Sequence, residues 1–202
     1  MNTDLNKLLD FVRFTHEIRN VQRAVLFETD TRNENDAEHG YQMALVAWYL
    51  IEAHGLKLDK LRCVGMAMVH DVTETQAGDV SIFGSKEDRE LQIVREKEAA
   101  RKFKKDWPEF TSMHELIIEY NEHKTPEGKF VYALDKLMPE INNYLYEGRA
   151  WKAQGVTLER VVEIKKGKID MNDTVNGYHQ KILVLMKGAD IFWHPEKDDQ
   201  SL

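Results

Sequence analysis

Apolar residues recur at helical spacing along most of this chain, and few residues interrupt the pattern. The 202 residues include only 4 prolines and 11 glycines, which leaves few of the turns that a many-stranded fold requires. In the first example, Leu5, Leu8, Leu9 and Val12 occupy one side of a helix. The pattern predicts helices near residues 4–20, 36–55, 58–71, 86–105, 111–122, 126–148 and 157–188, the last with an interruption near residues 167–173. We therefore expect an all-α fold, a compact helical bundle.

The chain length corresponds to a single domain. We expect this domain to occupy residues 1–190 and a C-terminal tail to occupy residues 191–202. Pro139 should kink or divide the helix in which it lies. Residues 28–35 are polar and predict a loop, after which Asp36 is a suitable N-cap for the next helix.

Charge and cysteine content exclude several kinds of partner. The chain has 35 acidic and 28 basic residues and a net charge of −7, so we expect neither a nucleic acid polymer nor a membrane as its partner. The longest apolar run, Met43 to Ile51, is too short to cross a bilayer, and the N-terminus lacks the features of a signal peptide. Cys63 is the single cysteine, which excludes an internal disulfide. These features predict a cytoplasmic protein in which histidines and carboxylates bind any metal ion.

Two of the 8 histidines occupy unusual positions. His39 lies four residues before Met43 on the apolar side of its helix, so its side chain should point inward. His70 is followed directly by Asp71 at the end of an apolar helix, and Asp135 borders the apolar side of a later helix. Taken singly, these residues have ordinary explanations: a hydrogen-bonded core histidine, an exposed helix end and a salt-bridged aspartate.

Together the same residues form a complete set of ligands for one divalent metal ion: His39, His70, Asp71 and Asp135. Nitrogen and oxygen ligands without a thiolate suit Mn, Co, Fe, Ni or Zn, and Mg is less favoured. A six-coordinate ion would keep two positions for water and substrate. Glu74 lies one helical turn beyond His70 if the helix continues, and a carboxylate there can act as a general acid or base. A solvated helix end is the alternative for Glu74.

Four short motifs occur in an order that resembles the HD-domain superfamily of metal-dependent phosphohydrolases. They are Glu38-His39, HDVTE at residues 70–74, GDV at residues 78–80 and LDKL at residues 134–137. The N-terminal segment LLDFVRF is also similar to the short, single-domain branch of this family, which includes bacterial 5'-deoxynucleotidases. The resemblance covers residues 5–148.

The resemblance assigns roles to residues around the proposed ligands. It implies that the same two histidines and two aspartates bind the metal and that Glu74 assists proton transfer. Asp79 would contact the substrate, although an aspartate after a glycine is also a common turn residue. Arg23 would bind the phosphate, with Arg19 and Arg32 as the alternatives.

The activity that the resemblance implies is hydrolysis of nucleoside 5'-monophosphates by a metal-activated water, with Asp71 and Glu74 in catalytic roles. Hydrolysis of a cyclic, tri- or hyperphosphorylated nucleotide and a non-catalytic regulatory role with bound metal are the alternatives. Some deoxynucleotidases have an aromatic residue directly after the arginine, where this chain has Ala24 and Val25. Deoxyribose specificity is therefore not implied. Related proteins are often dimers, so a homodimer is the expected assembly.

Overall fold

The computed structural model describes residues 4–26, 32–77 and 86–194 and has the predicted all-α architecture. A two-stranded antiparallel sheet accompanies the helices. In chain order the elements are α1 (Leu5–Ile18), β1 (Gln22–Leu26), β2 (Asn33–Asn35), α2 (Asp36–His54), α3 (Lys60–Val69), α4 (Glu74–Ala77), α5 (Lys86–Asp106), α6 (Thr111–Glu122), α7 (Pro126–Leu145), α8 (Arg149–Ala153), α9 (Leu158–Lys165), the 3-10 helix η1 (Ile169–Met171) and α10 (Asp173–Lys187).

The boundaries of α2 follow from local capping interactions. The Asn35 side chain accepts a hydrogen bond from the backbone N–H of Glu38, and the Glu38 carboxylate accepts one from the backbone N–H of Asn35. The prediction that Asp36 caps this helix is therefore wrong by one residue, because Asp36 is its first helical residue. Gly55 ends α2 in the left-handed conformation with φ 57°, which glycine adopts without strain.

The hairpin of β1 and β2 differs from the prediction of a loop over residues 28–35. Gln22 pairs with Asn35 and Leu26 pairs with Asn33, so the hairpin leads directly into α2. Residues 27–31 lie outside the described part of the chain. β2 is a polar strand of three residues, which is too short to show the apolar alternation by which strands are recognised.

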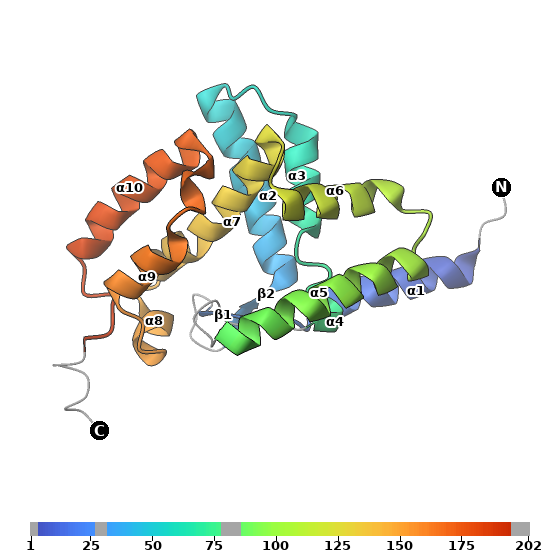
Figure 1. Ribbon diagram of the computed structural model, residues 1–202, viewed down its shortest axis with the longest axis horizontal. Helices are drawn as coiled ribbons and strands as arrows, with labels where there is room; N and C mark the ends of the chain where they lie inside the picture. Colours follow the sequence, from blue (N-terminus) through green and yellow to red (C-terminus); the bar gives the residue numbers. More distant parts are fainter. Residues whose placement is uncertain (1–3, 27–31, 78–85, 195–202) are drawn as a thin grey trace.

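The main hydrophobic core lies where α2, α3 and α7 pack together in the middle of the molecule (Figure 1). Its largest fully buried side chains include Met43, Met66, Phe130 and Leu134. A second cluster joins α1, α5 and α6 through Phe14, Phe103, Met113 and Ile117. A third cluster holds the C-terminal helices together. This arrangement brings together the N-terminal end of α2, the C-terminal end of α3 and the middle of α7.

The C-terminal part of the chain bears on two expectations, the effect of Pro139 and the position of the tail. α7 runs without division through Pro139, and the side-chain amide of Asn143 donates a hydrogen bond to the Pro139 carbonyl. Phe192, in the segment expected to form the tail, is buried and stacks on Trp151 with ring centroids 5.2 Å apart. The backbone N–H of Trp193 donates to the Val156 carbonyl. Packed structure therefore extends past residue 190, and residues 195–202 lie outside the description.

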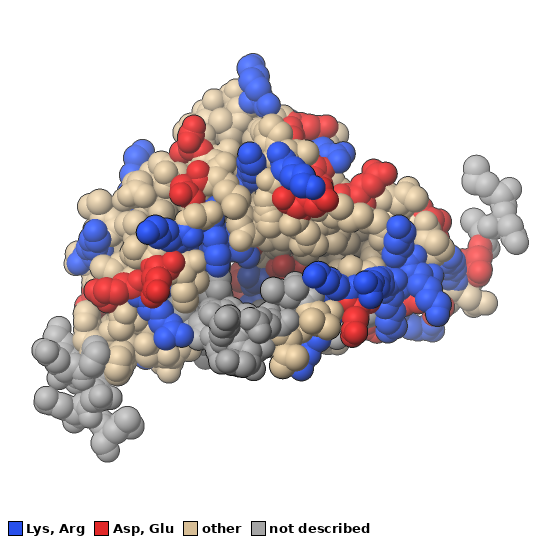
Figure 2. Space-filling view, in the orientation of Figure 1, with Lys and Arg blue, Asp and Glu red and all other residues tan. Residues whose placement is uncertain are grey.

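Charged side chains of both signs cover the face shown in Figure 2, and Lys and Arg gather over α5. Arg101, Lys102, Lys104 and Lys105 are exposed, whereas Ala99 is buried, as expected for a charged surface helix. Over the described residues, no helix combines the length and apolar character needed to cross a bilayer.

Candidate metal centre

His39 lies in the first turns of α2 on the side that packs against α3. Its side chain is 1% exposed. The next residue, Gly40, allows the close approach of the two helices, because a Cβ atom there would lie 3.3 Å from the carbonyl oxygen of Ala67. The rings of His39 and His70 consequently lie with centroids 5.4 Å apart. The inward orientation of His39 agrees with its predicted register before Met43.

His70 caps the C-terminal end of α3, and its two ring nitrogens have different surroundings. Nδ1 lies 2.9 Å from the carbonyl oxygen of Ala67, an acceptor, so Nδ1 carries a proton. Nε2 lies 3.0 Å from Oδ2 of Asp71 and 3.7 Å from Oδ1 of Asp135. The ring therefore presents Nε2 to two carboxylates.

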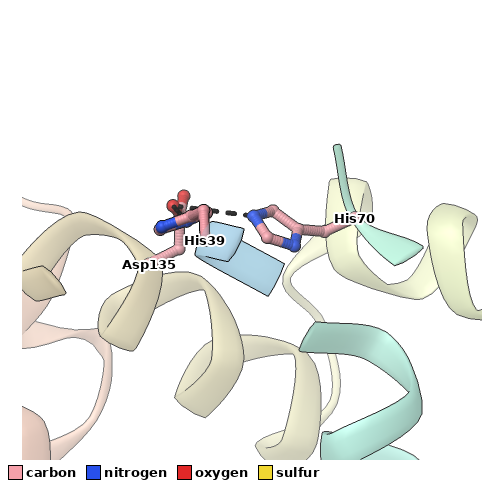
Figure 3. A group of neighbouring side chains, drawn as sticks. All are labelled: His39, His70 and Asp135. Carbon is pink, nitrogen blue, oxygen red and sulfur yellow. Dashed lines mark hydrogen bonds and ion pairs between the residues drawn. The ribbon is translucent and has the colours of Figure 1, made fainter. Parts of the chain in front are cut away.

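Asp135 extends from the middle of α7 and is 3% exposed. Its Oδ1 lies 3.2 Å from Nε2 of His39, and its Oδ2 accepts hydrogen bonds from the Tyr120 hydroxyl at 2.6 Å and the Lys136 ammonium at 2.5 Å. Figure 3 shows His39, His70 and Asp135 pointing toward one another from three separate helices. One ligand atom from each lies within 4.8 Å of those of the other two.

Asp71 joins this group through His70 and also contacts Arg23. Its Oδ2 accepts a hydrogen bond from Nη1 of Arg23 at 2.6 Å. The four residues that the sequence suggested as ligands are thus neighbours, but only the other three, His39, His70 and Asp135, form the compact group. The Arg23 side chain, on β1, is 13% exposed, and its Nη1 also donates to Asp36 at 3.3 Å.

The electrostatics of the cluster show what kind of ligand fits it. Burial, together with the nearby charge of Arg23, lowers the pKa of His39 to about 4, so its ring is neutral. Burial also opposes charge on His70, but Asp71 and Asp135 outweigh it and raise the pKa of His70 to about 10. The carboxylates thus favour a positive charge at Nε2 of His70. A divalent cation bound by the two imidazoles in their neutral forms and by the carboxylates would replace that positive charge, so the donor set fits a metal ion.

The structure adds two residues that sequence reasoning did not single out as functional. Tyr120 is buried in α6. Burial raises the pKa of its hydroxyl, and the charge of Asp135 raises it further, so the hydroxyl stays protonated and donates a hydrogen bond. Lys136 is partly accessible, and Asp135 raises the pKa of its ammonium group despite burial. The position of Lys136 directly after Asp135 in LDKL was a usable signal, whereas nothing in the sequence marks Tyr120.

The remaining predicted residues have mixed outcomes. Glu74 begins the separate helix α4 after a turn in which its backbone N–H donates to the Asp71 carbonyl, so α3 does not continue to Glu74 and the condition for its placement one helical turn beyond His70 is not met. Its charge is among those that raise the pKa of Arg23 against the effect of burial, which places it near the site. Asp79 lies outside the described residues. Arg19 is exposed after α1, and Arg32 donates hydrogen bonds to Glu38.

Comparison with known proteins relates both the sequence and the fold to one family. A family model described as HD domain matches residues 15–175. The crystal structure of a predicted metal-dependent phosphohydrolase from Magnetospirillum magnetotacticum MS-1 is similar, with a TM-score of 0.80 and 26% sequence identity over 94% of this chain and 98% of that one. A conserved hypothetical protein from Pyrococcus furiosus shares the fold, with a TM-score of 0.59 and 21% identity.

Curated relatives carry nucleotidase names. The chain is 33% identical over 132 residues to 5'-deoxynucleotidase HDDC2 from Bos taurus, which covers 64% of this chain and 62% of that protein. The Homo sapiens protein of the same name is 32% identical, with 64% and 63% covered. The 5'-deoxynucleotidase hdd1 from Schizosaccharomyces pombe is 26% identical over 127 residues, which are 60% of this chain and 63% of that one. The match thus spans a little under two thirds of the length of these relatives.

Proposed function

The chain belongs to the HD-domain family, and from this premise we propose that it is a metal-dependent phosphohydrolase that acts on nucleoside 5'-monophosphates. One observation carries the proposal. His39, His70 and Asp135 come from three helices and are far apart in sequence, yet their ligand atoms converge in a buried site beside Arg23. The nucleotidase names of the relatives and the phosphohydrolase name of the similar structure support the same reaction class.

His39, His70, Asp71 and Asp135 would hold one divalent ion, chosen from Mn, Co, Fe, Ni and Zn, with Mg less favoured. When bound, such an ion acts as a Lewis acid toward a phosphoryl oxygen and makes water a stronger nucleophile. Hydrogen bonds from neighbouring groups hold the proposed ligands in place. The Ala67 carbonyl fixes the ring of His70, and the remaining carboxylate oxygen of Asp135 is held by Tyr120 and Lys136. For this reason we assign the ligand role to these four residues together.

Arg23 would bind the phosphate of the substrate. Its guanidinium carries a permanent charge, because the carboxylates around it raise its pKa despite burial. One of its terminal nitrogens, Nη1, is already paired with Asp71 and Asp36. Arg23 would therefore orient Asp71 and bind a phosphate oxygen from the same position. Lys136 is a second cation beside the ligands and can share the charge of a dianionic phosphate.

Glu74 would hold or transfer a proton near the reacting oxygen. A carboxylate close to Arg23 and Asp71, but not among the compact ligand group, suits a general acid or base. Asp79 would contact the substrate, as the GD motif of the family implies. A Glu74→Gln variant tests the first role directly, because it should retain bound metal and lose turnover.

The test of the proposed function is phosphate release from purified protein. The protein is stripped with a chelator and supplied with Mn²⁺, Co²⁺, Ni²⁺, Zn²⁺ or Mg²⁺, and a panel of ribo- and deoxyribonucleoside 5'-monophosphates is compared with cyclic nucleotides and triphosphates. We expect metal-dependent release from the monophosphates. His70→Gln should abolish both metal binding and turnover. His114→Gln is the matched control, because His114 is also buried but donates its Nε2–H to the Trp107 carbonyl in a separate cluster.

Variants of Arg23 separate substrate binding from metal binding. Arg23→Ala should raise KM and lower kcat without reducing metal content, because arginine is not a ligand. Arg23→Lys should recover little, because lysine lacks the planar pair of donors. A stripped parent protein that releases phosphate at the full rate without added metal would contradict the proposed function. So would a parent protein that binds metal but hydrolyses none of the nucleotides.

The assembly and the compartment also remain predictions. Tyr41, Leu45, Trp48 and Tyr49 are exposed on one side of α2, which provides apolar surface for the expected homodimer. Sedimentation velocity of the parent protein and a Trp48→Glu variant would test this, and a monomeric parent protein would contradict it. The predicted cytoplasmic location requires fractionation of cells.

A further inference from the structure

Glu34 is a buried carboxylate that the sequence did not mark and that faces two residues of the site. It lies in β2 and is 6% exposed. Its Oε2 lies 3.6 Å from Nδ1 of His39 and 3.6 Å from Nε of Arg23. Its Oε1 accepts a hydrogen bond from the side-chain amide of Asn142 at 3.5 Å. The carboxylate is therefore placed between the proposed phosphate-binding arginine and one proposed metal ligand.

Two buried nitrogen atoms face the carboxylate of Glu34. Among the described residues, neither Nδ1 of His39 nor Nε of Arg23 has a hydrogen-bond partner, although both atoms are buried. Buried polar atoms of this kind are nearly always hydrogen-bonded, because they have lost their contact with water. A movement of about 0.5 Å would bring either nitrogen within hydrogen-bonding distance of the Glu34 carboxylate.

The local fold explains why one carboxylate faces both residues. β1 and β2 are antiparallel partners, so Arg23 on β1 lies beside Glu34 on β2. α2 begins directly after β2 with its capping box, which places His39 one turn into the helix and near the same point. Asn142 of α7 donates a hydrogen bond to the other carboxylate oxygen of Glu34 and thereby restrains the orientation of the carboxylate.

We propose that Glu34 is a positioning residue that accepts hydrogen bonds from Nδ1–H of His39 and Nε–H of Arg23. A proton on Nδ1 leaves a lone pair on Nε2, which faces Asp135 and His70 and is the atom that would bind the metal. Histidine ligands of metals commonly donate their second N–H to a carboxylate in this way. The contact with Nε fixes the plane of the Arg23 guanidinium. The inference rests on the proposed function, because it takes His39 as a ligand.

The first experiment compares metal affinity in Glu34→Gln and Glu140→Gln. Glu140 is the matched control, since its carboxylate is fully buried and pairs with Nδ1 of His179 at 2.7 Å outside the site. Metal-free proteins are titrated with Co²⁺ or Zn²⁺ in competition with a chelator. We expect Glu34→Gln to bind either ion about 10–100-fold more weakly than the parent protein, as for other second contacts to metal ligands. Glu140→Gln should match the parent protein.

A second comparison separates the two contacts of Glu34. Arg23→Ala removes the contact with Nε, and adding Glu34→Gln to it should weaken metal binding by the same factor as adding Glu34→Gln to the parent protein. With Arg23 intact and saturating metal, Glu34→Gln should raise KM for nucleoside monophosphates, because the guanidinium is no longer fixed. If Glu34 had a purely structural role, Glu34→Gln would lower stability without weakening metal binding and without raising KM at saturating metal.

A third measurement needs no variant and therefore does not depend on the folding of Glu34→Gln. In parent protein labelled with ¹⁵N-histidine and loaded with Zn²⁺, His39 should carry its proton on Nδ1 and bind the metal through Nε2. Metal bound through Nδ1 would overturn the inference, as would a Glu34→Gln variant that binds metal as tightly as the parent protein. These outcomes leave the proposed function intact. A parent protein that binds no metal would reject both.

Discussion

Replacing Tyr120 by phenylalanine removes one hydroxyl from the candidate metal centre and leaves the ring in place. The hydroxyl donates a hydrogen bond of 2.6 Å to Oδ2 of Asp135, and both residues are buried. A hydrogen bond to a charged group contributes about 1.5–3 kcal/mol to stability. Because the same oxygen keeps the Lys136 ammonium at 2.5 Å, we expect the lower part of this range, about 1.5–2 kcal/mol.

This loss is measurable in the metal-free protein by urea unfolding and by thermal unfolding. For a chain of this length, 1 kcal/mol corresponds to about 2–4 °C, so the melting temperature of Tyr120→Phe should fall by about 3–8 °C. Tyr132→Phe is the matched control. Its ring centroid lies 5.9 Å from that of Tyr120, but its hydroxyl makes no hydrogen bond to another described residue. The control should change the free energy of unfolding by less than about 0.5 kcal/mol.

Metal affinity provides an independent check on the same variant. If Asp135 is a ligand, the loss of a donor to its outer oxygen should weaken metal binding in Tyr120→Phe by about 10-fold or more. If Tyr120→Phe unfolds at the same urea concentration as the parent protein, the hydrogen bond to Asp135 contributes nothing, and the account of this carboxylate given above is wrong. Equal losses in Tyr120→Phe and Tyr132→Phe would refute it as well.

Three further predictions concern residues outside the metal centre. Burial raises the pKa of Cys63 to about 12, so its thiol should resist a disulfide reagent at pH 8 in the folded protein and react at once in urea; fast reaction when folded would contradict this. Gly148→Ala would place a Cβ atom 1.9 Å from the Ile191 carbonyl oxygen at φ +66°, so we expect a loss of stability of at least about 2 kcal/mol. Gly155→Ala, at φ +65° with its nearest neighbouring atom 4.0 Å away, should lose only about 1 kcal/mol in the same thermal unfolding assay. Burial lowers the pKa of Lys165 to about 8 from 10.5, so the folded protein releases this proton at a lower pH than the unfolded chain does. The free energy of unfolding of the parent protein, relative to that of Lys165→Met, should therefore rise by about 3 kcal/mol between pH 8 and 10.5. A difference that does not change with pH would contradict the lowered pKa.

The parts of the fold that could be predicted are those that local chemistry determines. The helical spacing of apolar residues located most of the helices, and Gly55 marked the end of α2 correctly, because these signals depend on neighbours in the sequence. The same reasoning gave the inward orientation of His39, since a polar residue in an apolar stripe has only one direction in which to point. The sequence left open whether Pro139 kinks or divides its helix, and the structure excludes the division, because α7 continues through it.

The residues that surround the ligands could not be found in this way. Glu34 stands in the polar segment before α2, where a carboxylate attracts no notice, and its partner Asn142 is more than a hundred residues away. In the sequence, Tyr120 belongs to the apolar side of α6, as its apolar neighbours do. Only the packing of α6 against α7 brings its hydroxyl to Asp135. Such residues are defined by contacts between distant segments, which no spacing rule contains.

This difference bears on how substrate preference can arise in the site. The proposed ligands lie on α2, on α7 and at the C-terminal end of α3, and these helices pack in the main core, so the metal end of the site is fixed by the most predictable part of the fold. Arg23 lies instead on the short hairpin, and within the described residues its orientation depends on contacts with Glu34, Asp36 and Asp71. Changes in the hairpin can therefore move the phosphate-binding group without disturbing the core. Apart from Glu34, we expect substitutions in β1 and β2 to change KM and substrate preference more than metal affinity, whereas substitutions at the ends of α2 and α3 should change metal affinity and stability together.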